Sequence, residues 1–195
     1  MDNQSVVKFS FPLNVYAMAL WLEEKRVDYL HYGIFNSSED TILQAQKNST
    51  DLVVSNLPAP PCQILEVGIG LGTTAHKLAH LGYEVIGISP DKQQIVCAHR
   101  FGPQQRLKFV AMPFEHFLLG GKRFDVILFQ ESAQYIDSEL LLRQSYGLLS
   151  DQGTLLIIDE AASRVLPKLE AYAVELGFTL AGKTDLTARA APSLT

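Results

Sequence analysis

The stretch from Ile64 to Ala79, ILEVGIGLGTTAHKLA, brings one acid next to three closely spaced glycines. Glu66 lies at the end of an apolar run, and Gly68, Gly70 and Gly72 follow it at every second position. Glycine tolerates positive φ angles and lets a backbone approach a ligand closely. A helix that begins after such a turn offers free N–H groups. The stretch therefore predicts a ligand site at a strand–turn–helix junction.

The spacing of these glycines argues against two common phosphate sites. The dinucleotide fingerprint is G-x-G-x-x-G, whereas this stretch reads G-x-G-x-G with Thr73 at the place of the third glycine. No Gly-Lys-Ser/Thr closes the turn, as it would in a P-loop. The Glu66 carboxylate would also repel a pyrophosphate, because like charges a few ångströms apart repel strongly at moderate dielectric. The turn therefore favours a nucleoside that carries an ammonium group.

Two other patterns resemble catalytic sites but lack essential parts. His76 and His80 have the i,i+4 spacing of zinc ligands on a helix, but Lys77 stands where a zinc protease has its glutamate. We expect both histidines on a solvated helix face. Ser132 is not part of a G-x-S-x-G sequence, so a hydrolase nucleophile is not supported.

Composition and charge narrow the function classes. The 195 residues fit one domain, and 47% hydrophobic with 19% charged residues is typical of a globular protein. The net charge is −5 and no basic run is longer than Lys25-Arg26 or Lys122-Arg123, which argues against a nucleic-acid groove. No segment resembles a signal peptide or approaches the about 18 apolar residues of a membrane span. Cys62 and Cys97 show no metal spacing, so we expect a reduced, cytoplasmic protein.

From Cys62 onward, short apolar runs alternate with helical patterns. We expect strands at residues 62–68, 83–88, 107–111, 124–130 and 153–159, helices at 73–81, 91–100, 138–149 and 165–176, and a further strand at 178–186. This alternation predicts an open, mostly parallel α/β sheet with helices on both faces. Residues 1–60 contain helical patterns near 12–24 and 39–56 and are expected to form a lid on the core, residues 61–195, within a single domain.

The acid and the glycines read E-x-G-x-G-x-G after a first strand, which resembles the first motif of class I S-adenosylmethionine-dependent methyltransferases. The resemblance runs roughly from Tyr29 to Ser193 and implies a Rossmann-like fold. In that family the turn wraps the amino acid part of the cofactor and the acid organises it. The resemblance thus implies these roles for Glu66, Gly68, Gly70 and Gly72.

The end of the second strand departs from the commonest pattern of that family, in which an acid holds the ribose hydroxyls. Ser89 stands there and Gln94 follows, which is similar to the subgroup of tocopherol, sarcosine and cyclopropane-lipid methyltransferases. Ser89 can still hydrogen-bond a ribose hydroxyl. Asp91 is either a further polar group of the site or the N-cap of the next helix.

After the third strand the family often has an acid that holds the adenine amino group, and Met112 stands at that position. The resemblance implies that Met112 and Phe114, with Pro113 between them, enclose the purine ring. Glu115 or a backbone group would then hold the amino group. The alternative is an apolar plug beneath the sheet edge.

The fourth strand leads into FQESAQYID, which resembles the ES-x-x-H piece of small-molecule methyltransferases with Tyr135 in place of histidine. This implies that Glu131 lies near the transferred methyl group and that Tyr135 orients the nucleophile; alternatively, Glu131 only caps the loop. Related enzymes carry a Tyr/His-x-Gly piece before the core. It implies that Tyr29, His31 and Tyr32 close over the cofactor, unless they form a small aromatic core.

The family usually has a seventh, antiparallel strand between the fifth and the sixth. The sequence ends at Thr195, which leaves no room for it. We therefore expect a short sheet, or an edge completed by self-association or by a further domain.

These observations together predict S-adenosylmethionine-dependent methyl transfer to a small-molecule acceptor. The alternative is a non-catalytic S-adenosylmethionine-binding domain or a partner subunit of a larger assembly, which the departures at Ser89 and Met112 keep open. A nicotinamide-dependent enzyme would need the third glycine and an acid at the second strand.

Overall fold

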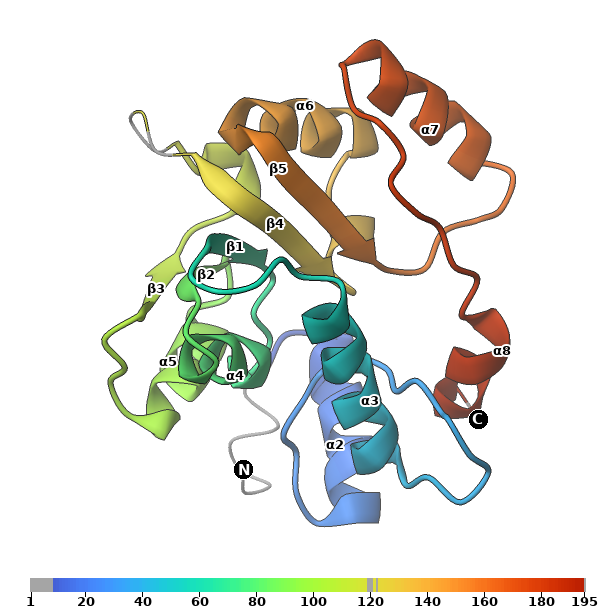
Figure 1. Cartoon of the computed structure of the whole chain (residues 1–195). Helices are drawn as coiled ribbons and strands as arrows, with labels where there is room; N and C mark the ends of the chain where they lie inside the picture. The colour runs from blue at the N-terminus through green and yellow to red at the C-terminus, as the bar shows by residue number, and fades with distance from the viewer. Residues whose placement is uncertain (1–8, 119–120, 122, 195) are drawn as a thin grey trace.

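A computed structural model describes residues 9–118, 121 and 123–194. Within them, five parallel strands form one sheet in the order β3-β2-β1-β4-β5 (Figure 1). The strands are β1 (Gln63–Val67), β2 (Glu84–Ser89), β3 (Leu107–Ala111), β4 (Phe124–Gln130) and β5 (Leu149–Ile158). The chain order reverses between β1 and β4, which is where open α/β sheets bind their ligands.

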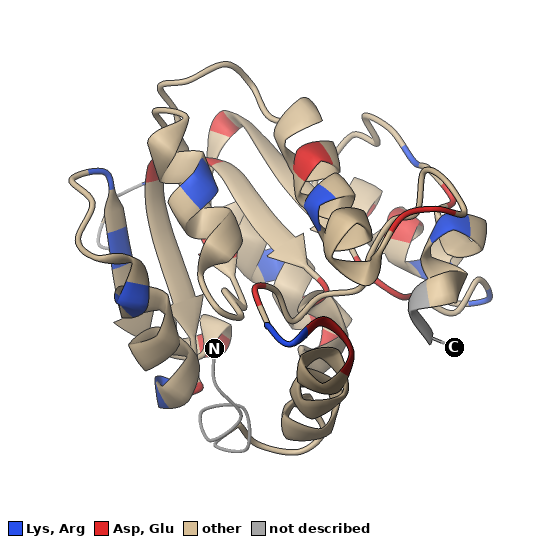
Figure 2. Cartoon of the chain, turned by 90° about the horizontal axis from the view of Figure 1, so that it is seen from below, with Lys and Arg blue, Asp and Glu red and all other residues tan. Residues whose placement is uncertain are grey.

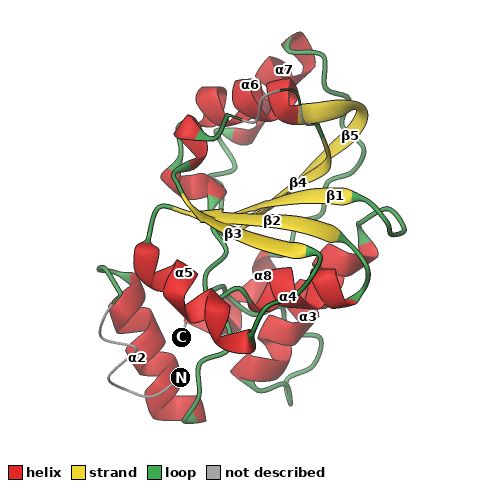
Figure 3. Ribbon diagram, turned by 90° about the vertical axis from the view of Figure 1, so that its left-hand side faces the viewer, coloured by secondary structure: helices red, strands yellow, loops and turns green. Residues whose placement is uncertain are grey.

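Helices cover both faces of the sheet (Figure 3). Helices α6 (Ser138–Leu148) and α7 (Leu166–Glu175) lie on one face, over a core cluster that includes Leu65 and Phe129. Helices α3 (Ile42–Ser55) and α4 (Thr73–His80) lie on the other, over a cluster that includes Ile64 and Leu128. Neighbouring residues of one strand thus belong to opposite cores, which explains the continuous apolar runs of β1 and β4.

Side-chain caps fix where several helices begin. Thr41 accepts a hydrogen bond from the backbone of Gln44 at the start of α3, and Asp137 does the same for α6. The carboxylate of Asp91 accepts from the N–H of Gln93 and starts α5 (Lys92–Ala98), which continues as a short 3-10 turn at His99–Phe101. Asp91 is therefore an N-cap residue.

The N-terminal segment packs against the sheet domain. Helix α2 (Leu13–Glu24) and the residues after it form a third core cluster, in which Ala17, Leu20 and Val27 meet Leu71 of the glycine turn and Cys97 of α5. Both cysteines are free and buried. In the described part of the chain, no helix is long and apolar enough to cross a membrane.

The predicted strand at residues 178–186 is wrong. This segment runs from α7 to α8 (Thr187–Ala190) without pairing to β5, which is the edge of the described sheet. It crosses to the N-terminal segment instead, where the N–H of Phe35 donates to the carbonyl of Arg189 at 2.9 Å (Figure 1). The other predicted elements are present. β3 and β4 have the predicted bounds and the others have shifted ends; β5 begins four residues earlier than the predicted residue 153.

In the view of Figure 2, the Lys and Arg positions are spread over separate helices and loops, and Lys25 and Arg26 are adjacent in the chain. Four ion pairs are present among the described residues, and all lie at the surface. Such pairs contribute little to stability.

Candidate active site

The glycine turn joins β1 to α4 in a backbone conformation that favours glycine. Gly68, Gly70 and Gly72 have φ angles of 77°, 53° and 77°. A Cβ atom on Gly68 would lie 2.4 Å from the Cβ of Ser132, and one on Gly72 would lie 2.6 Å from the Cβ of Ala98. Packing as well as φ therefore requires glycine at these two positions.

Gly70 differs from its neighbours because its surroundings are less tight. A Cβ there would meet only Leu30, at an ordinary contact distance of 3.6 Å. Gly72 is the N-cap position of α4, and no side chain caps this helix. The first N–H groups of α4 thus lack a side-chain acceptor, and the backbone of the turn forms a cradle for a ligand.

Glu66 is the buried acid beneath this turn. Its side chain is 3% exposed, and its Oε2 atom has no hydrogen-bond partner. Burial raises the pKa of this carboxyl to about 8. An unpartnered buried carboxyl oxygen is costly, and a cationic ligand group would both satisfy it and favour its ionised form. The residues of the turn thus fit the ammonium end of S-adenosylmethionine.

Ser89 and Gln94 form one buried unit at the end of β2. The Ser89 hydroxyl donates to Oε1 of Gln94 at 2.8 Å and accepts from the N–H of Asp91 at 3.1 Å. The hydroxyl proton is therefore already used within the protein. The side-chain amide N–H groups of Gln94 remain as donors for a ligand hydroxyl.

The residues after β3 lie in two different environments, the ligand edge of the sheet and the hydrophobic core. The N–H of Met112 donates to the carbonyl of Ser89 at 2.9 Å, which holds Met112 and Pro113 at the ligand edge of the sheet. Phe114 is 2% exposed and packs edge-to-face on Phe129, with ring centroids 5.2 Å apart. The Phe114 ring is thus part of the core, as in the apolar-plug alternative, and its contact with a purine stays a prediction.

Glu131 follows β4 in a left-handed conformation, with φ of 57°. Its N–H donates to the carbonyl of Ile158 at 2.7 Å, and its Oε2 accepts from the N–H of Tyr32 at 2.6 Å. Burial raises the pKa of this carboxyl to about 8, and the charges of Asp159 and Glu160 act in the same direction. Positive φ is rare for a non-glycine residue and is found preferentially at functional sites.

Tyr135 is 64% exposed and lies at the rim of this region. Burial of part of its ring and the charges of Asp159 and Glu131 raise the pKa of its hydroxyl. The two residues predicted near the methyl group therefore share one electrostatic environment.

Sequence reasoning missed Asp159, which follows β5 directly. Its carboxylate accepts hydrogen bonds from the N–H groups of Ala133 and Gln134, at 2.6 and 3.2 Å, and so holds the turn that contains Tyr135. The signal was present, because parallel strands end at one edge and Asp159 closes an apolar strand as Glu66 does.

The segment from Asp28 to Tyr32 crosses this edge of the sheet. The hydroxyl of Thr73 donates to the carbonyl of Asp28, Leu30 faces Gly70, and Tyr32 binds Glu131. Tyr29 and His31 are buried, with ring centroids 4.9 Å apart. The segment thus lies over the predicted cofactor turn, although Tyr29 and His31 themselves form a small aromatic core.

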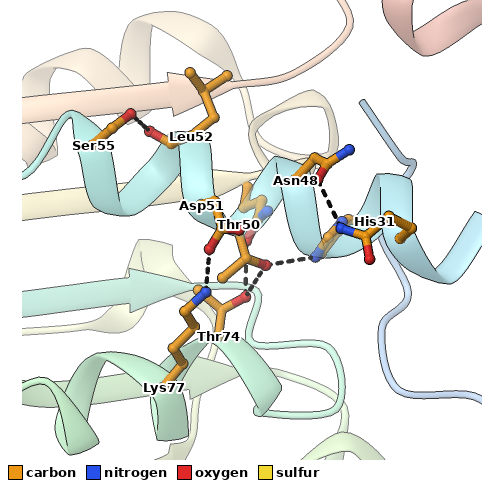
Figure 4. A network of polar contacts seen from close by, with 10 residues as sticks. His31, Asn48, Thr50, Asp51, Leu52, Ser55, Thr74 and Lys77 are labelled. Atoms are coloured by element: carbon orange, nitrogen blue, oxygen red, sulfur yellow. Dashed lines mark hydrogen bonds and ion pairs between the residues drawn. The ribbon is translucent and has the colours of Figure 1, made fainter. Parts of the chain in front are cut away.

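A buried polar network anchors this segment, and sequence reasoning missed it as well. Figure 4 shows Thr50 of α3 between His31 and Thr74 of α4, at 3.5 and 3.3 Å from its Oγ1. Thr74 also donates to Gln130, whose amide donates to Ser49, both at 3.0 Å. The signal was the row of polar residues on α3 at helical spacing, which would otherwise face solvent.

The expectation for His76 is also wrong. Its side chain is 7% exposed, its Nε2 lies 2.8 Å from the carbonyl oxygen of Ala98, and its ring packs near Phe101 and Phe109. His80 is exposed as expected. His76 is therefore a structural residue that ties α4 to the end of α5.

Residues 65–157 match the family model described as a methyltransferase domain. The resemblance predicted from the sequence is confirmed. The matched residues include all the predicted site residues except Tyr32, which lies in the segment that crosses the glycine turn.

A curated relative, the ubiquinone biosynthesis O-methyltransferase of Pelagibacter ubique, is 31% identical over 107 residues, which are 53% of this chain and 44% of the relative. The match thus spans less than half of that protein. Two solved structures share the fold of this chain at a TM-score of 0.73. The cyclopropane synthase MmaA2 from Mycobacterium tuberculosis is 16% identical, with 84% of this chain and 71% of that chain covered. The [4+2]-cyclase SpnF is 20% identical, with 82% and 68% covered.

Proposed function

We propose that this protein binds S-adenosylmethionine at the glycine turn and transfers its methyl group to a small-molecule acceptor. The observation that carries the proposal is Glu66, a buried carboxyl with an unpartnered oxygen beneath three glycines of positive φ. The family match over residues 65–157 and the O-methyltransferase relative support the same activity.

Different residues around the turn would bind different parts of the cofactor. Glu66 would pair with the ammonium group, and the backbone of Gly68–Gly72 would enclose the amino acid part. Gln94, held by Ser89, would donate to a ribose hydroxyl, and Met112 with Pro113 would pack on the adenine. Tyr32 would cover the cofactor from the crossing segment, because its amide is held by Glu131.

When bound, the cofactor supplies a methyl group on a positively charged sulfur. The protein's task is then to hold an acceptor in line with that group, which can contribute several kcal/mol to lowering the barrier. Glu131 and Tyr135 would orient the acceptor, and Glu131 would take its proton where one must be lost. The raised pKa of Glu131, about 8, is close to the range in which a general base is most effective.

We also propose a cytoplasmic location and a second contact surface. The two cysteines are free, as in a reducing compartment. Strand β5 is an unpaired edge of the described sheet, with Ile157 42% exposed, so a second copy or a further domain could pair there. Light scattering of the wild type and of Ile157→Lys would test this, because the charge would disrupt such pairing.

The experiment that tests the function has two stages. Calorimetric titrations with S-adenosylmethionine, S-adenosylhomocysteine and NAD first test the site, and binding of the first two without a response to NAD is expected. Transfer of a labelled methyl group to a panel of amines and phenols then tests catalysis. Binding without transfer to any acceptor would favour the non-catalytic alternative, and no binding to the folded protein would overturn the proposal.

A further inference from the structure

Six residues at the carboxyl ends of β4 and β5, in the crossing segment and in helix α2 form a group that we call the acid–aromatic cluster. Its members are three carboxylates and three tyrosines: Glu131, Asp159, Glu160, Tyr16, Tyr32 and Tyr135. The rings of Tyr16 and Tyr32 are edge-to-face with centroids 5.7 Å apart, and the Tyr32 amide binds Glu131. Asp159 holds the N–H groups of the turn that contains Tyr135.

The charge of this cluster is uncompensated. In the described part of the chain, none of the four ion pairs includes Glu131, Asp159 or Glu160. The charges that act on Tyr32, after the effect of burial, are those of Glu160, Glu131 and Tyr135, and all raise the pKa of its hydroxyl. No Lys, Arg or His contributes to the shifts of Glu131, Tyr32 or Tyr135. Asp159 and Glu160 therefore give the cluster a negative potential with aromatic rings beside it, and Glu131 adds to this potential when it is ionised.

The cluster adjoins the glycine turn, beneath which Glu66 has a carboxyl oxygen without a hydrogen-bond partner. Ser132, next to Glu131, donates from its hydroxyl to the carbonyl of Val67 at 2.5 Å and faces Gly68. The unpartnered Oε2 of Glu66, in a side chain 3% exposed, lies on the neighbouring strand at the same edge. One edge thus offers two places for positive charge, one beneath the turn and one beside it.

The charge changes during methyl transfer decide which class of acceptor, a phenol or an amine, the cluster can bind. A phenol must become an anion before it attacks, and when its proton goes to Glu131 that anion still lies beside Asp159 and Glu160, which disfavours it in a partly desolvated site. An amine attacks as a neutral group and becomes positively charged. Carboxylates stabilise that charge directly, and tyrosine faces add a cation–π attraction.

We infer that the acceptor is a small aliphatic amine, bound as a cation in the acid–aromatic cluster and methylated on nitrogen. This inference rests on the proposed function. The ammonium form of the amine first gives one proton to the ionised carboxylate of Glu131. The nitrogen lone pair then forms the bond to the methyl carbon, the carbon–sulfur bond breaks, and its electron pair stays on sulfur. The product is a methylated ammonium ion and a neutral thioether.

The test uses a pair of probes that differ in charge but not in shape. Choline and 3,3-dimethylbutan-1-ol have the same outline, with a positive nitrogen replaced by carbon. Each is titrated by nuclear magnetic resonance into the full chain saturated with S-adenosylhomocysteine. Choline is expected to bind at least about tenfold more tightly than the alcohol, a difference of about 1.4 kcal/mol.

Variants then locate the binding. Glu160→Gln and Tyr135→Leu change exposed side chains and should each weaken choline binding by about threefold or more, whereas the matched surface change Glu175→Gln should not. Equal binding of both probes, or choline binding that neither variant changes, would overturn the inference. So would methyl transfer to phenols and not to amines.

The saturation step separates this inference from the proposed function. If S-adenosylhomocysteine binds but choline does not, the amine acceptor is wrong and the cofactor site stands. If S-adenosylhomocysteine itself does not bind, the proposed function fails first.

Discussion

The backbone N–H of Tyr32 donates to the Glu131 carboxylate at 2.6 Å, which joins two residues 99 positions apart in the chain. Glu131 holds a left-handed conformation at the end of β4, and Tyr32 belongs to the segment that crosses the glycine turn. One carboxylate therefore both fixes the crossing segment and faces the region predicted for the acceptor. Loss of this side chain should affect the closure of the site as well as its chemistry.

Two substitutions at position 131 separate backbone strain from the carboxylate. Both Glu131→Ala and Glu131→Gly remove the acceptor of the Tyr32 amide. Because φ is 57°, alanine keeps a strain of about 1–2 kcal/mol that glycine does not have. Urea unfolding should therefore show the glycine variant to be more stable than the alanine variant, and the Tyr32 amide should exchange faster in both. Equal stabilities would show that the left-handed conformation is absent.

The glycine turn itself contains one tightly packed and one loosely packed glycine. Gly72 and Gly70 have φ angles of 77° and 53°, but a Cβ on Gly70 would meet Leu30 at an ordinary contact distance of 3.6 Å. Gly70→Ala should cost about 1 kcal/mol of unfolding free energy from strain alone. Gly72→Ala should cost about 1–3 kcal/mol more, because its Cβ would overlap Ala98. Equal losses in denaturant titrations would contradict the close packing of the turn.

Gln130 is the centre of the buried network that anchors α3. Gln130→Met keeps the volume but removes the partners of Ser49 and Thr74. Losing these two buried hydrogen bonds should cost about 2 kcal/mol, although the Thr74 hydroxyl keeps Thr50 as a partner, whereas the exposed Gln152→Met should be nearly neutral. In a double-mutant cycle, Ser49→Ala should cost less in the Gln130→Met background than in the wild type. Additive losses would mean that the two side chains do not interact.

The sheet and the order of its elements could be predicted because their signals are local. The strands β1 and β4 are continuous apolar runs that helical patterns and glycines separate from the next elements, and this alternation is typical of a parallel sheet. The strand prediction for residues 178–186 was wrong because the segment begins with apolar residues typical of a strand. Whether it forms a strand depends on pairing with the edge strand β5, which the local sequence does not determine. His76 was misplaced and the core position of Phe114 was left open for a related reason, since their burial depends on Phe129, Phe101 and Phe109 from distant segments.

The candidate site could be predicted where its residues lie in one short sequence motif. It could not be predicted where the fold brings together residues from distant segments. Glu66 and the glycines lie within seven residues. The link from Tyr32 to Glu131 and the turn held by Asp159 join segments whose distance no spacing rule gives. Their physical signs are a positive φ at a glutamate and a cluster of carboxylates that form no ion pair within the described residues, and both exist only in three dimensions.

The burial of Glu66 should make stability depend on pH. Its pKa is about 8 in the folded protein against an ordinary value of 4.5, so between these pH values the folded state keeps a proton that the unfolded chain has lost. Its contribution to stability therefore falls as pH rises through this window. Glu66→Gln should be more stable than the wild type at pH 8 by more than about 1 kcal/mol, and nearly equal at pH 4.5. Urea unfolding at both pH values measures this, and a constant difference would contradict the buried, unpaired carboxyl.

The most direct test of the central claim is the affinity for S-adenosylmethionine of the wild type and of Glu66→Gln, measured by calorimetry at pH 6.5 and 8.5. If the ionised Glu66 pairs with the ammonium group, wild-type affinity should fall by about tenfold or more at the lower pH, because the carboxyl must first lose its proton. Glu66→Gln should bind at least about tenfold more weakly at pH 8.5 and lose most of that pH dependence. A folded variant that binds as tightly as the wild type, with the same pH dependence, would contradict the account.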